Sequence, residues 1–136
     1  MTVPVADIAA IPVQSIPHTA NGVDVVDFLS NGTAKNGVIK NSPGQLYAVT
    51  AFSVDETPVY IRLYNKATAP LTTDTPVYRL MIPGSNSGIG SGFMKEWPLG
   101  LDVFTAGIGY RITTGIADDD DAVVSANEVI VNFEYK

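Results

Sequence analysis

The feature that most constrains the fold of this chain is a series of short segments in which every second residue is apolar. Such alternation is typical of a β-strand with one buried face, because successive side chains of a strand point to opposite sides. The clearest segments are 45–54, 58–65, 75–82, 108–113 and 128–135, and shorter ones are 23–29, 38–40, 92–97 and 101–104. Asn-Gly pairs and Gly- or Pro-rich stretches separate them, and no window convincingly favours a helix.

This alternation also predicts which side chains share a face. In segment 58–65 it sets one apolar face, Val59, Ile61 and Leu63, against a second face, Tyr60, Arg62 and Tyr64. In segment 45–54 one face is expected to carry Leu46, Ala48, Thr50, Phe52 and Val54. Several short strands at regular spacing favour two packed sheets. We therefore predict an all-β fold, a β-sandwich of the jelly-roll type.

The first residues of the chain predict an extended N-terminal arm. Pro4, Pro12 and Pro17 disfavour both a helix and a central strand, because proline fixes φ and lacks an amide hydrogen. The arm is too apolar for a free linker, and its predicted docking residues are Val3, Val5, Ile8, Ile11, Val13 and Ile16. It is expected to lie either on its own domain or on a neighbouring subunit. The predicted organisation is an arm with a first strand over 1–35 and a β-sandwich domain over 36–136.

Charge and composition narrow the classes of partner. With 14 acidic residues against 8 Lys and Arg, the net charge is −6, and such a chain repels phosphate backbones. Nucleic-acid binding is therefore not expected. The chain has no stretch of about 18 apolar residues, and its first residues lack the pattern of a secretion signal, so no membrane partner is expected. The absence of cysteine excludes disulfides and thiol catalysis.

The sequence offers no combination of residues that predicts an enzyme. His18 is the only histidine, and it lies in the predicted arm without an acidic partner at a useful spacing. The glycine-rich stretch 84–93 lacks the spacing of a phosphate-binding loop and is expected to be a flexible hairpin loop. Pairs for glycoside hydrolysis could be drawn from Asp55, Glu56, Glu96, Asp102, Glu128 and Glu134, but nothing favours any pair. We predict no catalytic residue, cofactor or metal site.

Two clusters leave alternatives open. The run Asp118–Asp121 is expected to be a solvated turn, although carboxylates in a loop can bind calcium, and copies of the loop around a symmetry axis could share a cation. The second cluster is Tyr60, Arg62 and Tyr64, which is either an interface or core face, where tyrosine hydroxyls find partners, or a face on which sugar rings stack.

Longer motifs provide a family resemblance. Residues 42–84, SPGQLYAVTAFSVDETPVYIRLYNKATAPLTTDTPVYRLMIPG, contain a G-x-LY strand, the motif Y-x-R-x-YN-K-A-x-A-P, and then T-D-T-P-V and I-P. Residues 98–136 close with G-L-x-V-F-x-x-G-I-x-Y-x-I-T-x-G-x-A-D and N-E-V-x-V-N-x-x-Y-K. Together they resemble a family of small virion proteins of tailed bacteriophages. The glycine-rich stretch is longer than in that family, and the first 35 residues fall outside the resemblance.

The resemblance implies a non-enzymatic structural protein of the virion, a capsid decoration or cement protein made in the bacterial host cytoplasm. Its expected partners are copies of itself, as a homotrimer, and the major capsid protein or another virion protein. The long connection between segments 58–65 and 75–82 then suits protein contact, because Pro70 and Pro76 stiffen it. The alternative function is a carbohydrate- or receptor-binding knob of a head or tail fibre.

Overall fold

The computed structural model describes residues 22–136, and within them eight strands form two antiparallel sheets. Sheet A has the order β1 (Asp24–Leu29), β8 (Val129–Tyr135), β3 (Gly44–Ser53) and β6 (Ser91–Phe104). Sheet B has the order β2 (Asn36–Lys40), β7 (Ile108–Thr113), β4 (Val59–Asn65) and β5 (Tyr78–Ile82). The predicted all-β class is confirmed. The predicted docking residues of the arm, Val3, Val5, Ile8, Ile11, Val13 and Ile16, lie outside the described residues.

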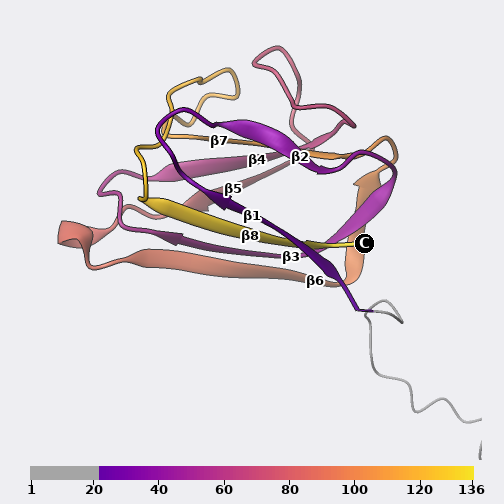
Figure 1. The fold of residues 1–136 in the computed structure, drawn as a ribbon, viewed down its shortest axis with the longest axis horizontal. Helices are drawn as coiled ribbons and strands as arrows, with labels where there is room; N and C mark the ends of the chain where they lie inside the picture. Colours follow the sequence, from indigo (N-terminus) through magenta and orange to yellow (C-terminus); the bar gives the residue numbers. More distant parts are fainter. Residues whose placement is uncertain (1–21) are drawn as a thin grey trace, which may run out of the picture.

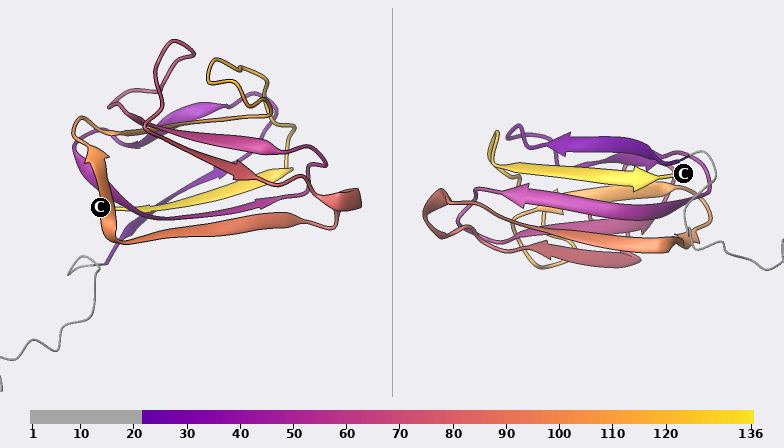
Figure 2. Two further views of the ribbon diagram at one scale, coloured as in Figure 1. Left: turned by 180° about the vertical axis from the view of Figure 1, so that it is seen from behind. Right: turned by 90° about the horizontal axis from the view of Figure 1, so that it is seen from below.

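The two sheets face each other across the core, with sheet B above sheet A in Figure 1. The right panel of Figure 2 shows the four strands of sheet A side by side. β1 forms one edge of this sheet and pairs along its length with β8. The structure therefore places the first strand in the same packed unit as the strands that follow residue 36.

Side chains from both inner faces fill the core. Phe28 of β1 and Phe133 of β8 both contact Tyr110 of β7, with ring centroids 5.9 and 5.2 Å from the tyrosine ring. The Tyr110 ring lies directly over Gly37 of β2, where an added Cβ would come within 2.6 Å of the hydroxyl. Full burial of each such aromatic side chain contributes roughly 1.5–3 kcal/mol. These contacts join the two sheets near the β1 and β2 edge.

Strand β3 departs from the predicted alternation at its beginning. Its register with both β6 and β8 shifts between Leu46 and Ala48. A bulge of this kind adds one residue to a strand and reverses the face on which the preceding side chains lie. Leu46 consequently belongs to the buried core, whereas Phe52 is 52% exposed. The prediction that Leu46 and Phe52 share a face was wrong for this reason.

Two connections differ in how well the sequence predicted them. β4 and β5 are antiparallel neighbours, so the long connection 66–77 does join a hairpin. The glycine-rich stretch, by contrast, does not close a hairpin: it carries the short 3₁₀ helix η1 (Asn86–Gly88) and leads from β5 in sheet B to β6 in sheet A. In Figure 1 it is the projecting bend that precedes β6.

Candidate functional site

Three arginines form a row across the outer face of sheet B. Arg111 of β7 pairs with Arg62 of β4, which pairs with Arg79 of β5, and Asn36 of β2 continues the row. Directly paired residues of antiparallel strands lie on one face with Cβ atoms about 5 Å apart. Three neighbouring guanidinium groups would repel one another without anionic partners. We call Arg111, Arg62 and Arg79 the arginine row.

The acidic loop, residues 114–122, supplies those partners. It leaves β7 and rises on the outer side of sheet B, as Figure 1 shows. The Arg62 guanidinium donates a hydrogen bond of 2.7 Å to the Thr113 hydroxyl. It donates two more, of 2.6 Å each, to the carbonyls of Gly115 and Ala117 in the loop. Its Nε lies 3.6 Å from Asp118 Oδ1. Arg62 is 1% exposed, so the loop and the strand enclose it.

Arg111 binds the next part of the same loop. Its guanidinium donates to the Asp118 carbonyl at 3.0 Å, to the Asp120 carbonyl at 2.7 Å and to Asp121 Oδ1 at 2.9 Å. Lys35 donates to the other oxygen of Asp121 at 2.6 Å. Inside the loop, Asp120 Oδ2 accepts the amide hydrogen of Gly115 at 2.9 Å. Buried guanidinium groups with several acceptors are far more strongly held than exposed ion pairs.

The basic side chains also set the ionisation of this loop. The bidentate hydrogen bonds from Arg79, at 2.8 and 2.5 Å, lower the pKa of the Asp118 carboxyl below its usual value. The hydrogen bond from Lys35, and then Arg111, lowers the pKa of Asp121. Both carboxylates are thus charged at neutral pH and compensate the arginine row.

This arrangement shows what the carboxylates of the run Asp118–Asp121 contact within one chain. The carboxylates of Asp118 and Asp121 turn toward arginine and lysine, and Asp120 turns toward backbone amides. Within residues 22–136, no group of three or more His, Asp or Glu side chains gathers as metal ligands do. The run Asp118–Asp121 is therefore a turn that the arginine row holds in place and whose Asp119 and Asp121 side chains remain exposed.

The second open cluster is largely covered. Tyr60, Arg62 and Tyr64 do share the outer face of sheet B, as their alternation predicted. Arg62 and Tyr64 are each only 1% exposed, whereas Tyr60 keeps part of its surface open. The Tyr64 hydroxyl is buried and has no hydrogen-bond partner among the described residues. Tyr64 therefore offers no open ring face, among the described residues, on which a sugar could stack.

The connection 66–77 is the other covering loop. The Lys66 ammonium donates to Asp74 Oδ2 at 2.5 Å, and the Leu71 amide donates to the same oxygen at 2.7 Å. These two contacts, the Leu71 amide first, lower the pKa of Asp74. Pro70 lies against Gly109 of β7, where an added Cβ would come within 2.7 Å of the ring. The loop is thus ordered by its own contacts with sheet B.

The outer face of sheet A is different, because apolar side chains there remain open. Leu29 of β1 pairs with Ile130 of β8, which pairs with Phe52 of β3, and Gly92 of β6 completes the row. These three side chains are 50, 42 and 52% exposed. Together with their neighbours they form what we call the apolar face, Val25, Leu29, Phe52, Val54, Met94 and Ile130.

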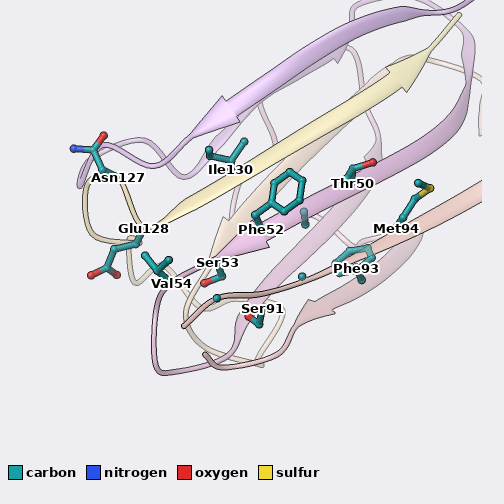
Figure 3. A pocket seen from close by; sticks show the side chains of 13 residues that line it. Thr50, Phe52, Ser53, Val54, Ser91, Phe93, Met94, Asn127, Glu128 and Ile130 are labelled. Atoms are coloured by element: carbon teal, nitrogen blue, oxygen red, sulfur yellow. The ribbon is translucent and has the colours of Figure 1, made fainter. Parts of the chain in front are cut away.

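Part of the apolar face is hollowed. Figure 3 shows the side chains of Ile130, Phe52 and Met94 projecting around this hollow, with Val54 at its end. Glycines at 90 and 92 leave the β6 side of the hollow without side chains. Contiguous exposed apolar surface of this kind marks sites of contact with other macromolecules or segments. This face was not predicted, because the alternation of β3 suggested that Phe52 would share the side of Leu46.

The carboxylates considered for hydrolysis lie mostly on this open side. Glu96 and Glu134 both pair with Ala48 from opposite sides, so they flank it on the outer face of sheet A. Two strand spacings separate them, roughly 10 Å, on a sheet surface and not across a cleft. Glu128 lines the hollow beside Asn127. The structure brings no other pair of the six onto paired positions.

Comparisons of the chain with protein-family models, with curated proteins and with solved structures found no match. Among residues 22–136, none of the helical structure is long and apolar enough to cross a bilayer. The function must therefore be argued from the two outer faces and from the sequence motifs.

Proposed function

We propose that this chain is a non-enzymatic structural protein of a phage virion, a capsid decoration or cement protein that assembles with copies of itself and binds the particle surface. The observation that carries the proposal is the apolar face of sheet A, whose large side chains stay about half exposed. A soluble protein rarely leaves such a patch open unless another surface covers it. The sequence motifs over residues 40–136 supply the virion context.

The strand pairing supports a jelly roll as the fold behind this function. β1 pairs with β8, β2 with β7, β3 with β6, and β4 with β5, all antiparallel. A ribbon of four such pairs, rolled so that β3 meets β8 and β4 meets β7, produces the two observed sheets. Jelly rolls of eight strands are common among viral capsid domains.

In this proposal the two loops above sheet B and the apolar face of sheet A have separate roles. The acidic loop and the 66–77 connection close one outer face with the chain's own residues. The other face and the predicted arm residues provide apolar contact for a neighbouring copy or the capsid shell. A homotrimer would bury such contacts around a closed symmetry axis.

Co-sedimentation with undecorated particles, combined with the mass of the assembly in solution, tests the proposal. The Phe52→Asp variant places a charge in the centre of the apolar face and should lower both binding and oligomer mass. The Met81→Asp variant is a matched control, because Met81 is 50% exposed on the outer side of sheet B. Full particle binding by Phe52→Asp, with Met81→Asp also unchanged, would contradict the role given to sheet A.

The alternative function, a carbohydrate- or receptor-binding knob, depends on exposed aromatic rings. Trp97 packs edge-on against Tyr78 with centroids 5.2 Å apart, and the Lys95 ammonium lies 5.6 Å from the Trp97 ring. These rings are partly exposed at the edge where β5 and β6 run near each other. A glycan array separates the two functions, because the decoration role predicts no glycan bound at this edge.

A further inference from the structure

We propose that residues 1–21 of the same chain dock on the apolar face of sheet A in the free subunit. This inference concerns the isolated protein and does not depend on its assignment to a virion. It assigns one occupant to the hollow around Phe52, Met94 and Ile130, which none of the described residues covers.

The first argument is where the described chain begins. Gly22 directly precedes β1, and β1 is an edge strand of the sheet that carries the apolar face. Gly22 has φ of +73°, a left-handed conformation that glycine adopts readily. Residues 1–21 therefore join the described fold at an edge of sheet A.

The second argument is reach. Along β1 the distance from Val25 to Leu29 is about 13 Å at the rise of a β-strand. Residues 17–21 alone can span about 17 Å when extended. Ile16 and the apolar positions that precede it are therefore within reach of the row formed by Leu29, Ile130 and Phe52. Docking within one chain is also favoured by high effective concentration.

The third argument is charge. The outer face of sheet A also bears Asp27, Glu96 and Glu134, which lie on the same side as the apolar row. A second copy packed face to face would bring three further carboxylates into the same interface. Residues 1–21 contain a single acid, Asp7, and no Lys or Arg. A nearly uncharged apolar segment therefore fits this face better than a second sheet A does.

The prolines indicate how the segment would bind. Pro4, Pro12 and Pro17 interrupt any long run of amide donors, so the segment cannot extend sheet A as a regular additional strand. It would instead lie across the outer face through side-chain contact. Ile8 and Ile11 lie in the longest proline-free stretch and are the residues expected to fill the hollow.

The test uses the full chain, which has no cysteine of its own. Met94→Cys reports on the apolar face, and Met81→Cys reports on the outer side of sheet B at similar exposure, 62 against 50%. Maleimide labelling of Met94→Cys should accelerate about tenfold when Ile8→Asp and Ile11→Asp are added, which corresponds to a cover bound by ~1.4 kcal/mol. Labelling of Met81→Cys should not change.

Two controls keep the inference falsifiable. Ser15→Asp with Thr19→Asp adds the same charge at polar positions of the segment and should leave Met94→Cys protected. Equal labelling of Met94→Cys with and without the isoleucine substitutions would overturn the proposal. So would protection of Met94→Cys in the otherwise unsubstituted chain that is lost on dilution, because the cover would then come from another molecule. Particle binding plays no part in these measurements.

Discussion

The outer faces of the two sheets carry the same geometric arrangement with opposite chemistry. On sheet B a row of arginines crosses three strands, and on sheet A a row of Leu29, Ile130 and Phe52 does so. Arg62 and Arg111 are each 1% exposed because the acidic loop folds over them, whereas the apolar residues stay about half exposed. Buried charge requires local partners, and a neighbouring loop supplies them here. Exposed apolar side chains have no such requirement and can be covered by another segment or another molecule.

The largest expected effect is on the outer face of sheet B, which the acidic loop covers. Arg62→Met should lower the free energy of unfolding by roughly 3 kcal/mol, because three acceptors lose their donor and Asp118 loses a cation. Urea unfolding followed by circular dichroism measures this loss. Arg62→Lys retains the charge without the planar fork, so its free energy of unfolding should lie between those of the wild type and Arg62→Met. A loss below about 1 kcal/mol in Arg62→Met would show that the loop is held by other contacts.

Acidification should weaken the same face. Because the pKa values of Asp118 and Asp121 are lowered in the folded protein, their contribution is complete above the unfolded carboxyl value, about 4, and is lost as the pH falls through the folded values. The Asp118→Asn, Asp121→Asn variant should therefore lose less stability below pH 4 than the wild type does.

The control for acidification removes the same charge from sheet A through Asp27→Asn and Asp102→Asn. Free energies of unfolding would be measured from neutral pH downward for wild type and both double variants. The comparison between the faces fails if the two double variants give the same dependence on pH.

The apolar face of sheet A should tolerate truncation of its side chains. Phe52→Ala should reduce the free energy of unfolding by no more than about 1 kcal/mol, because half of its ring already faces outward in residues 22–136. Phe133→Ala, at a fully buried position of the same sheet, should cost about 3–5 kcal/mol. Thermal or urea unfolding of the pair measures the difference. Similar losses would place Phe52 in a core and remove it from any docking surface.

The smallest expected effect concerns one hydroxyl group on the covered outer face of sheet B. The Tyr64 hydroxyl is buried without a partner among the described residues, so Tyr64→Phe should be neutral or should stabilise the protein by up to about 1 kcal/mol. Unfolding of the two proteins in parallel detects this change. A clear destabilisation would reveal an ordered water or a further group bonded to that hydroxyl.

Much of the strand content was predictable because it depends on local pattern. The expected segment 108–113 coincides with β7, and segments 128–135 and 58–65 match β8 and β4 within one residue. The shared face of Tyr60, Arg62 and Tyr64 was also predicted correctly. The sequence did not predict that Arg79 and Arg111 would lie beside Arg62. The outward positions of Arg79 and Arg111 were visible in the alternation, but nothing local told which strands are neighbours.

The exposed face escaped prediction for a related reason. One added residue near Tyr47 moves Leu46 into the core and leaves Phe52 outside. A regular alternation cannot reveal a bulge, because the bulge is fixed by pairing with two other strands. The hollow beside Phe52 also depends on Gly92, which belongs to β6 and is far from Phe52 in the sequence.

The sequence by itself determined that this chain forms short antiparallel strands, because side-chain alternation and turn residues act over a few neighbouring positions. Only the tertiary structure decided that three arginines from β7, β4 and β5 meet beneath the acidic loop, and that one sheet keeps an apolar outer face. Those outcomes depend on which strands pair and in what register, and this is set by packing between residues far apart in the chain.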